Sequence, residues 1–96
     1  MFNMHALNEK QINEKLGSIE GWELSGNSIQ KEFKLNNFAD ALGFLVKIGL
    51  EAEKMDHHPD MLLHGWNKVK ISLSTHSAGG ITDNDFKLAH KIENIH

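Results

Sequence analysis

The sequence contains no cysteine and only one proline among its 96 residues. Without cysteine, a disulfide framework, a thiolate nucleophile and a cysteine-ligated zinc site are all excluded. The lack of cysteine also fits a reducing compartment. The single proline, Pro59, marks one place where a helix is expected to stop.

Long hydrophobic runs are absent as well, so no stretch is apolar enough to span a bilayer. Residues 1–15 lack the basic start and the apolar centre of a secretory signal, and we therefore expect a cytoplasmic protein. The net charge of −3 argues against nucleic-acid binding through a basic surface. The ordinary content of charged (24%) and hydrophobic (40%) residues predicts one globular domain over residues 1–96.

The first half of the chain carries signals for a helix and a hairpin. Asn8 and Gln11 have the spacing of a capping box, which predicts a short helix over residues 8–16 that stops at Gly17. Two short strands, at residues 22–24 and 29–35, flank a Gly-Asn turn.

The second half predicts a long helix, a second hairpin and a last helix. The long helix runs from Asn37 to about His57, because Pro59 disfavours helical geometry at the residue before it. Strands follow at residues 60–64 and 66–75, and the second alternates apolar with polar residues, as expected for a sheet with one buried face. Thr82 and Asp85 form a capping box for the last helix. The order α-β-β-α-β-β-α indicates an α+β fold: a four-stranded antiparallel sheet with helices packed on one face.

The long helix is apolar on more than one side. A buried stripe is predicted at helical spacing, and Phe44, Val46 and Leu50 lie off it. Such a helix is either deeply buried or shared with another subunit, so we expect a homodimer or a homotetramer. The stripe comprises Phe38, Ala41, Leu42, Leu45, Ile48, Ala52 and Met55.

Histidines and carboxylates gather at the end of this helix. Glu53, Asp56 and His57 are spaced three and four residues apart, which places them on one helical face. His58 and Pro59 follow directly. Histidine titrates near neutral pH, so this cluster is suited to moving protons or to binding a metal. The plain alternative is a solvated helix end, where a histidine cation favours the helix dipole.

Three residues further along the chain are candidates for the same site. His76 continues the polar face of its strand, so it is expected at the surface rather than in the core. Trp66 has the same parity, and an exposed tryptophan suggests a stacking wall or an interface. Asp85 is explained by helix capping alone, and a catalytic role would be additional.

Metal binding is the main rival to acid–base chemistry. Three imidazoles and two carboxylates could serve zinc or iron. However, the sequence lacks the His-x-x-x-His or His-x-His spacing that puts two ligands on one side, and adjacent helical residues diverge by about 100°. We therefore favour acid–base chemistry with no metal and no cofactor.

Together these residues resemble the pterin-4a-carbinolamine dehydratases over most of the chain, from about Gly21 to Ile95. The combination of His-His-Pro with Thr-His is the specific part of this resemblance. The matching segments are Gly21-Trp22, Glu53-x-x-Asp56-His57-His58-Pro59, Trp66, Asn67-Lys68-Val69, Thr75-His76 and Gly80-Ile81-Thr82-x-x-Asp85-x-x-Leu88-Ala89.

The resemblance implies a hydro-lyase that dehydrates 4a-hydroxytetrahydropterin to quinonoid dihydropterin after an aromatic amino acid hydroxylase has acted. It implies His57 and His76 as the acid–base pair and His58 as a residue that holds the pterin. Glu53 and Asp56 would orient the imidazoles or bind the pterin. Asp85 would support His76, and Trp66 fills the aromatic position of the motif.

Two departures from the family pattern lie near the expected pocket rim. Met61 stands where an aromatic residue is frequent, and the segment between Pro59 and Asn67 is one residue longer than in vertebrate members. Substrate tolerance is therefore more open than the reaction. Two other functions stay open: a pterin-binding accessory protein without turnover, and a dimerisation cofactor of a transcription factor, as in the vertebrate relatives.

Overall fold

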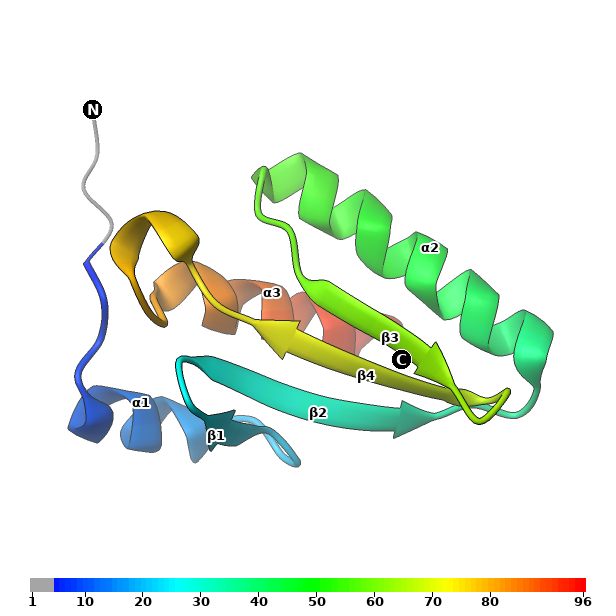
Figure 1. Ribbon diagram of the computed structural model, residues 1–96, viewed down its shortest axis with the longest axis horizontal. Coiled ribbons are helices and arrows are strands. Elements are labelled where there is room, and N and C mark those ends of the chain that lie inside the picture. Colours follow the sequence, from blue (N-terminus) through cyan, green and yellow to red (C-terminus); the bar gives the residue numbers. More distant parts are fainter. Residues whose placement is uncertain (1–4) are drawn as a thin grey trace.

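The computed structural model describes residues 5–96 and has the expected element order (Figure 1). The helices are α1 (Glu9–Leu16), α2 (Phe38–Met55) and α3 (Asp83–Ile95). The strands are β1 (Glu23–Ser25), β2 (Ser28–Lys34), β3 (Asp60–His64) and β4 (Lys68–Leu73), and a short 3₁₀ turn, η1 (His76–Ala78), follows β4.

The four strands form one antiparallel sheet in the order β1-β2-β4-β3. Helix α3 runs behind the central strands with α2 beside it (Figure 1). Val69, Ile71 and Leu73 of β4 are fully buried, as their alternation predicted. The α+β fold expected from the sequence is confirmed.

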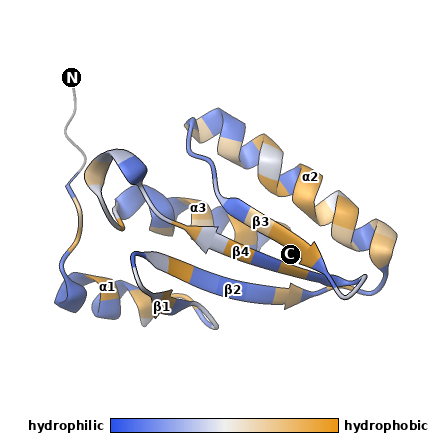
Figure 2. Ribbon diagram, in the orientation of Figure 1, coloured by the Kyte–Doolittle hydropathy of each residue, from blue (hydrophilic) through white to orange (hydrophobic). Residues whose placement is uncertain are grey.

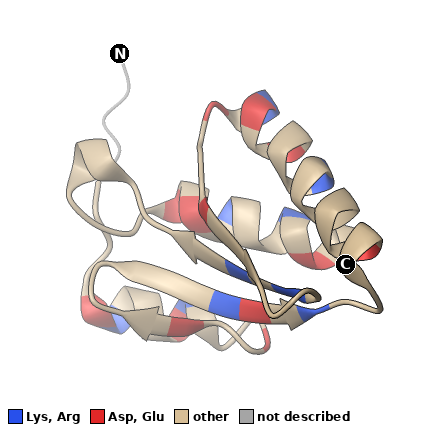
Figure 3. Ribbon diagram, turned by 45° about the vertical axis from the view of Figure 1, so that its right-hand side comes forward, with Lys and Arg blue, Asp and Glu red and all other residues tan. Residues whose placement is uncertain are grey.

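The opposite face of the sheet is mostly polar, because the residues between the buried ones on β2 and β4 are charged or polar. In register across this face, Glu32 of β2 lies opposite Lys70 of β4, and Lys34 lies opposite Lys68. Figure 2 shows β2 as mostly hydrophilic, and Figure 3 shows charges of both signs side by side on the central strands.

Side-chain caps fix where the helices begin. Asn8 and Thr82 each form the expected capping box, with Gln11 and Asp85 respectively. Asn37 caps α2 by accepting a hydrogen bond from the backbone N–H of Asp40. These caps satisfy N–H groups that lack partners within a helix.

The buried face of α2 differs from the predicted stripe. Phe44, expected on a second apolar face, is buried, whereas Phe38 and Leu42, expected in the stripe, are exposed. With several apolar positions around the helix, periodicity alone does not decide which of them faces the sheet. The buried residues are Ala41, Phe44, Ile48 and Ala52, and the exposed apolar row is Phe38, Leu42, Val46 and Leu50.

Two boundaries near the predicted site also differ. Helix α2 ends at Met55 rather than near His57, so Asp56 and His57 do not continue its face. Strand β4 begins at Lys68 rather than at Trp66, because Gly65 and Trp66 both have positive φ values, of 54° and 59°. A residue in this left-handed region cannot continue a strand.

Within residues 5–96, no helix has the length and apolar character needed to cross a membrane.

Candidate active site

A left-handed residue at the end of α2 turns the chain so that His57 faces inward. Asp56 has φ 51° and ψ 44°, and its N–H donates to the carbonyl of Glu53 at 3.1 Å. The N–H of His57 donates to the carbonyl of Ala52 at 3.0 Å. This pair of bonds is the Schellman motif, in which aspartate is one of the few residues other than glycine to tolerate the left-handed position.

His57 forms a buried pair with Asp85. Its Nε2 lies 2.5 Å from Oδ1 of Asp85, whose side chain is fully buried, while 10% of the His57 side chain is exposed. The two residues are 28 positions apart and come from the end of α2 and the first turn of α3. A carboxylate bound to one ring nitrogen orients the imidazole and fixes which nitrogen is left for chemistry.

The other oxygen of Asp85 is also fully bound. Oδ2 accepts the backbone N–H of Thr82 at 2.9 Å and the hydroxyl of Thr75 at 3.0 Å. The Thr75 and Thr82 hydroxyls lie 2.8 Å apart. Asp85 therefore caps α3 and binds the histidine with the same carboxylate.

His57 lines a cavity of about 300 Å³ together with His76 and His58. His76 is exposed, as predicted, and it opens the 3₁₀ turn after β4 rather than extending that strand. The bridge between Thr75 and Gly80 closes the base of this turn, with N–H to carbonyl distances of 2.8 and 3.3 Å. The complete lining is Asp56, His57, His58, Ser74, Thr75, His76 and Ser77.

Three further predicted residues, Glu53, Asp56 and Pro59, line this cavity or lie next to a residue that does. Nε2 of His58 lies 2.8 Å from Oε1 of Glu53, and both side chains are exposed. Asp56 lines the cavity from its left-handed position. Pro59 lies between His58 and the start of β3 and is half-buried.

Trp66 is not brought to this cavity within one chain. It lies in the turn joining β3 to β4, whereas His58 precedes β3 and His76 follows β4, at the other end of the hairpin (Figure 1). About five residues of strand at roughly 3.3 Å each separate the two ends. Trp66 is 62% exposed, as its parity suggested, but within one chain it is no wall of this cavity.

The structure also changes which histidine Asp85 supports. The sequence placed Asp85 beside His76, but its partners are His57, Thr75 and Thr82. Sequence reasoning missed Thr75 as a partner of Asp85, although its parity with Ile71 and Leu73 marks it as buried and therefore in need of a hydrogen-bond partner. Ser74 and Ser77, which line the cavity, gave no comparable signal.

A metal site would need several ligands converging on one point. Among residues 5–96, no three His, Asp or Glu side chains are grouped in this way. The pairs that do form, His57 with Asp85 and His58 with Glu53, each join one imidazole to one carboxylate.

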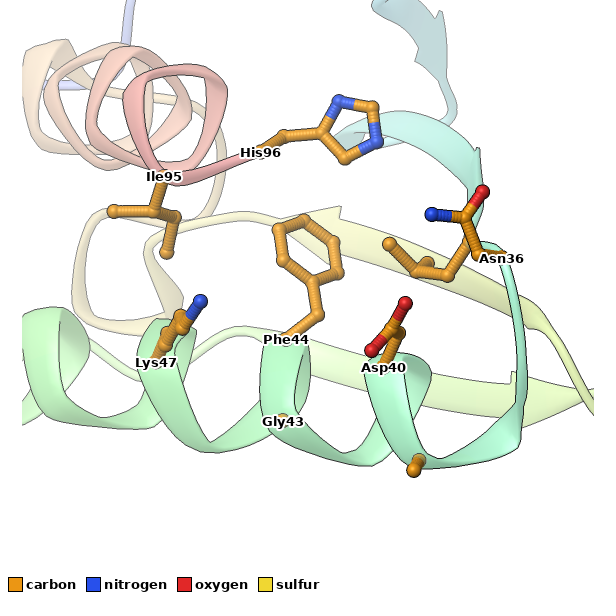
Figure 4. Close-up of a pocket in the computed structure, with 9 residues that line it drawn as sticks. Asn36, Asp40, Gly43, Phe44, Lys47, Ile95 and His96 are labelled. Carbon is orange, nitrogen blue, oxygen red and sulfur yellow. The ribbon is translucent and has the colours of Figure 1, made fainter.

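Another cavity, of about 340 Å³, lies between the first half of α2 and the end of α3 (Figure 4). Its aromatic residues are Phe44 and His96, whose rings lie 5.4 Å apart. The His96 ring also lies 4.8 Å from Phe33 of the core, so it is part of the packing there. Asp40 and Lys47 line this cavity, but it lacks the paired imidazoles of the cavity at His57.

Comparison with known sequences identifies the family of this chain. The sequence model of the family described as "Pterin 4 alpha carbinolamine dehydratase" matches residues 5–95. The chain belongs to this family. A relative from Sulfolobus acidocaldarius is 47% identical over 93% of this chain and 97% of its own length. One from Roseiflexus castenholzii is also 47% identical, over 93% of this chain and 95% of its own length. Both carry pterin-4-alpha-carbinolamine dehydratase as a provisional name.

Solved structures share the fold. A crystal structure titled as a transcriptional coactivator/pterin dehydratase from Brucella melitensis is similar with a TM-score of 0.89 and 39% identity, over 95% of this chain and 98% of that one. A pterin dehydratase-like protein, described as a RuBisCO assembly factor in the alpha-carboxysome, gives a TM-score of 0.65 at 20% identity, over 78% of this chain and 88% of that one. The second likeness concerns the fold alone.

Proposed function

We propose that this family member is a hydro-lyase that dehydrates 4a-hydroxytetrahydropterin to quinonoid dihydropterin. The observation that carries the proposal is the cavity where His57, held by buried Asp85, meets His58 and His76. In this reaction the proton on N5 leaves, the C4a–O bond breaks, and the electron pair freed at N5 forms the N5=C4a double bond. The hydroxyl takes up a proton and leaves as water, so no oxidant or reductant takes part.

His57 and His76 are the proposed acid–base pair. One removes the N5 proton and the other protonates the leaving hydroxyl, because imidazole can carry or lack a proton near neutral pH. The two side chains reach the same cavity from the segment after α2 and from the turn after β4. General acid–base catalysis of this kind contributes about 10²–10⁴-fold for each group.

The other cavity residues have proposed roles in binding. His58, with its exposed ring bound to Glu53, holds the pterin at the rim. Asp56 offers a carboxylate to the donors of the pterin ring, and Pro59 restricts the backbone between His58 and β3. Such a protein works in the cytoplasm in functional association with an aromatic amino acid hydroxylase, which produces the carbinolamine substrate.

A second function, binding of a protein partner, is favoured by one observation. The exposed apolar row of α2 includes Val46 and Leu50, with 63% and 60% of their surface accessible. We propose that this row mediates self-association to a homodimer or a homotetramer. A role as a dimerisation cofactor would use the same row, and a pterin-binding accessory role would use the cavity without turnover.

The decisive experiment follows carbinolamine dehydration by ultraviolet absorbance while an aromatic amino acid hydroxylase generates the intermediate. Intact protein is compared with His57→Ala, His57→Gln and His76→Ala, and with His90→Ala as an exposed histidine outside the cavity. We expect acceleration by intact protein and by His90→Ala, and a loss of about 10²–10⁴-fold in the other three. No acceleration by folded intact protein would refute the enzymatic proposal. Pterin binding without turnover would then support the accessory role.

A further inference from the structure

We propose that Asp85, held in place by Thr75 and Thr82, is a positioning residue that fixes His57 as the Nε2–H tautomer and leaves Nδ1 as its proton-exchanging atom. The kinetic part of this inference rests on the proposed function. The tautomer itself is a property of the free protein and can be measured without any substrate.

The direction of the hydrogen bonds follows from counting protons. An ionised carboxylate only accepts, so the hydroxyl of Thr75, 3.0 Å from Oδ2 of Asp85, donates its single proton there. The contact of 2.8 Å between the two threonine hydroxyls must then be donated by Thr82. Oγ1 of Thr82 in turn accepts the N–H of Asn84 at 3.3 Å. The chain of donors runs from Thr82 through Thr75 to Asp85.

This arrangement gives each oxygen of Asp85 a separate task. Oδ2 accepts two donors, the hydroxyl of Thr75 and the N–H of Thr82. Oδ1 is left to His57, at 2.5 Å from Nε2. Because Asp85 is fully buried, His57 is the donor that satisfies Oδ1, and Nε2 therefore carries a proton.

The other ring nitrogen of His57, Nδ1, is the one left for the cavity. Among residues 5–96, Nδ1 of His57 has no hydrogen-bond partner in the structure, while the imidazole lines the cavity. A proton taken up at Nδ1 gives an imidazolium whose charge is stabilised by the buried carboxylate, as in the histidine–aspartate pair of serine proteases. A proton leaving Nδ1 restores the same tautomer, so the ring acts in either direction through one atom.

Replacing Asp85 with asparagine gives the sharpest test, because the shape is kept and one acceptor becomes a donor. The two groups that donate to Oδ2 of Asp85 would donate to the amide oxygen of the asparagine. The NH₂ group of the asparagine would then face Nε2 of His57. His57 must then accept at Nε2 and carry its proton on Nδ1. We expect Asp85→Asn to invert the tautomer and to lower kcat, by up to about 10⁴-fold as for the corresponding change in a serine protease.

The tautomer is read from ¹⁵N NMR spectra of histidine-labelled protein at a pH where His57 is neutral. Intact protein should show a protonated Nε2 and an unprotonated Nδ1, and Asp85→Asn the reverse. Thr75→Val, which keeps the side-chain shape, removes one of the two donors to Oδ2 but leaves Asp85 as an acceptor for Nε2, so the tautomer should stay the same. Its kcat should be about 10–100-fold lower, the loss found when a partner that orients a metal-bound histidine is removed. Thr75→Ser, which restores the donor, should restore kcat. His90 serves as an internal reference without this network.

A protonated Nδ1 in intact protein would overturn the inference. An unchanged tautomer in folded Asp85→Asn would overturn it as well. If Asp85→Asn does not fold, the tautomer of intact protein and the kcat of the Thr75→Val and Thr75→Ser pair decide. If no dehydration is seen but the tautomers change as expected, the proposed function fails while the positioning network stands.

Discussion

His57 and His76 border the same cavity but differ in burial, so their replacement should affect stability unequally. His57→Ala would leave Asp85 as an unpaired charge in the interior, and removing one partner of a buried pair lowers the free energy of unfolding by about 3–5 kcal/mol. His76→Ala, at an exposed site, should change it by less than about 0.5 kcal/mol. Urea denaturation of both variants measures the difference.

His57→Gln is the matched control for this comparison. Its amide can donate to Oδ1 of Asp85, so it should recover part of the stability lost in His57→Ala while still being unable to shuttle a proton. Equal stability of His57→Ala and intact protein would contradict the buried pair. For the same reason, His57→Gln is the cleaner probe of catalysis.

Asp56 is expected to affect stability through its left-handed backbone as well as through its charge. In the left-handed region a residue with a Cβ is less stable than glycine by roughly 1–2 kcal/mol. Asp56→Gly should therefore be more stable than Asp56→Ala by about this amount, as judged by thermal denaturation. Equal stability would show that the turn does not hold this geometry in solution.

Asp56→Gly also removes the carboxylate without disturbing the turn. A raised KM in that variant would support the proposed contact between the Asp56 carboxylate and the pterin.

At the scale of helices and strands, sequence patterns succeed where the information is local. The capping boxes at Asn8 and Thr82 and the alternation along β4 involve residues within a few positions of each other, and all were predicted correctly. The end of α2 was placed too late, because Pro59 restricts only its neighbour, whereas the left-handed turn at Asp56 stops the helix earlier.

The roles of the candidate site residues stay predictions, whereas their positions can be compared with the structure. His57, His58 and His76, which the family motif marks together, line one cavity. The partner of Asp85 was assigned to the wrong histidine, because a contact across 28 residues depends on how α2 and α3 cross, which no local pattern records. Trp66 illustrates the same limit, since a left-handed turn removed it from the strand that gave it its parity.

Two lysines near Glu51, Lys54 of α2 and Lys91 of α3, predict a pH effect at this residue. A hydrogen bond from Lys54, together with the charges of Lys54 and Lys91, holds the pKa of the Glu51 carboxyl below its usual range. A lowered pKa in the folded state contributes stability that is present above the unfolded pKa and lost as the pH falls through the folded pKa.

NMR titration of the Glu51 carboxyl carbon measures this effect. We expect a midpoint below that of an unpaired glutamate, and Lys54→Ala should raise it toward the ordinary value. Because the ion pairs are exposed to solvent, high salt should reduce the shift. A midpoint that is the same in Lys54→Ala and in intact protein would contradict the assignment of Lys54 as the main cause.

At the scale of the whole molecule, the row of Phe38, Leu42, Val46 and Leu50 makes α2 apolar on its outer side as well as on its inner side. The four residues recur every four positions and therefore form a continuous row along the helix. Fully burying a side chain of this size contributes about 1.5–3 kcal/mol. A second copy of the same row would bury both at once, which is why self-association is proposed through this surface.

A charge in this row should break the assembly without unfolding the chain. In Val46→Glu or Leu50→Glu, association would place a carboxylate in apolar surroundings, and a penalty of about 3 kcal/mol weakens association more than 100-fold. We expect intact protein to sediment as a dimer or a tetramer at micromolar concentration and these variants to sediment as monomers with unchanged circular dichroism. Lys47→Glu, a neighbouring exposed residue outside the row, is the charge control and should stay assembled. A strict monomer for intact protein would refute self-association.

Variants in the row also separate the effect of assembly from that of the acid–base pair. The reason is that the His57 cavity lies near the C-terminal end of α2, whereas Phe38 begins the helix at its other end. A monomeric variant that keeps full dehydratase activity would show that one chain provides the complete catalytic site.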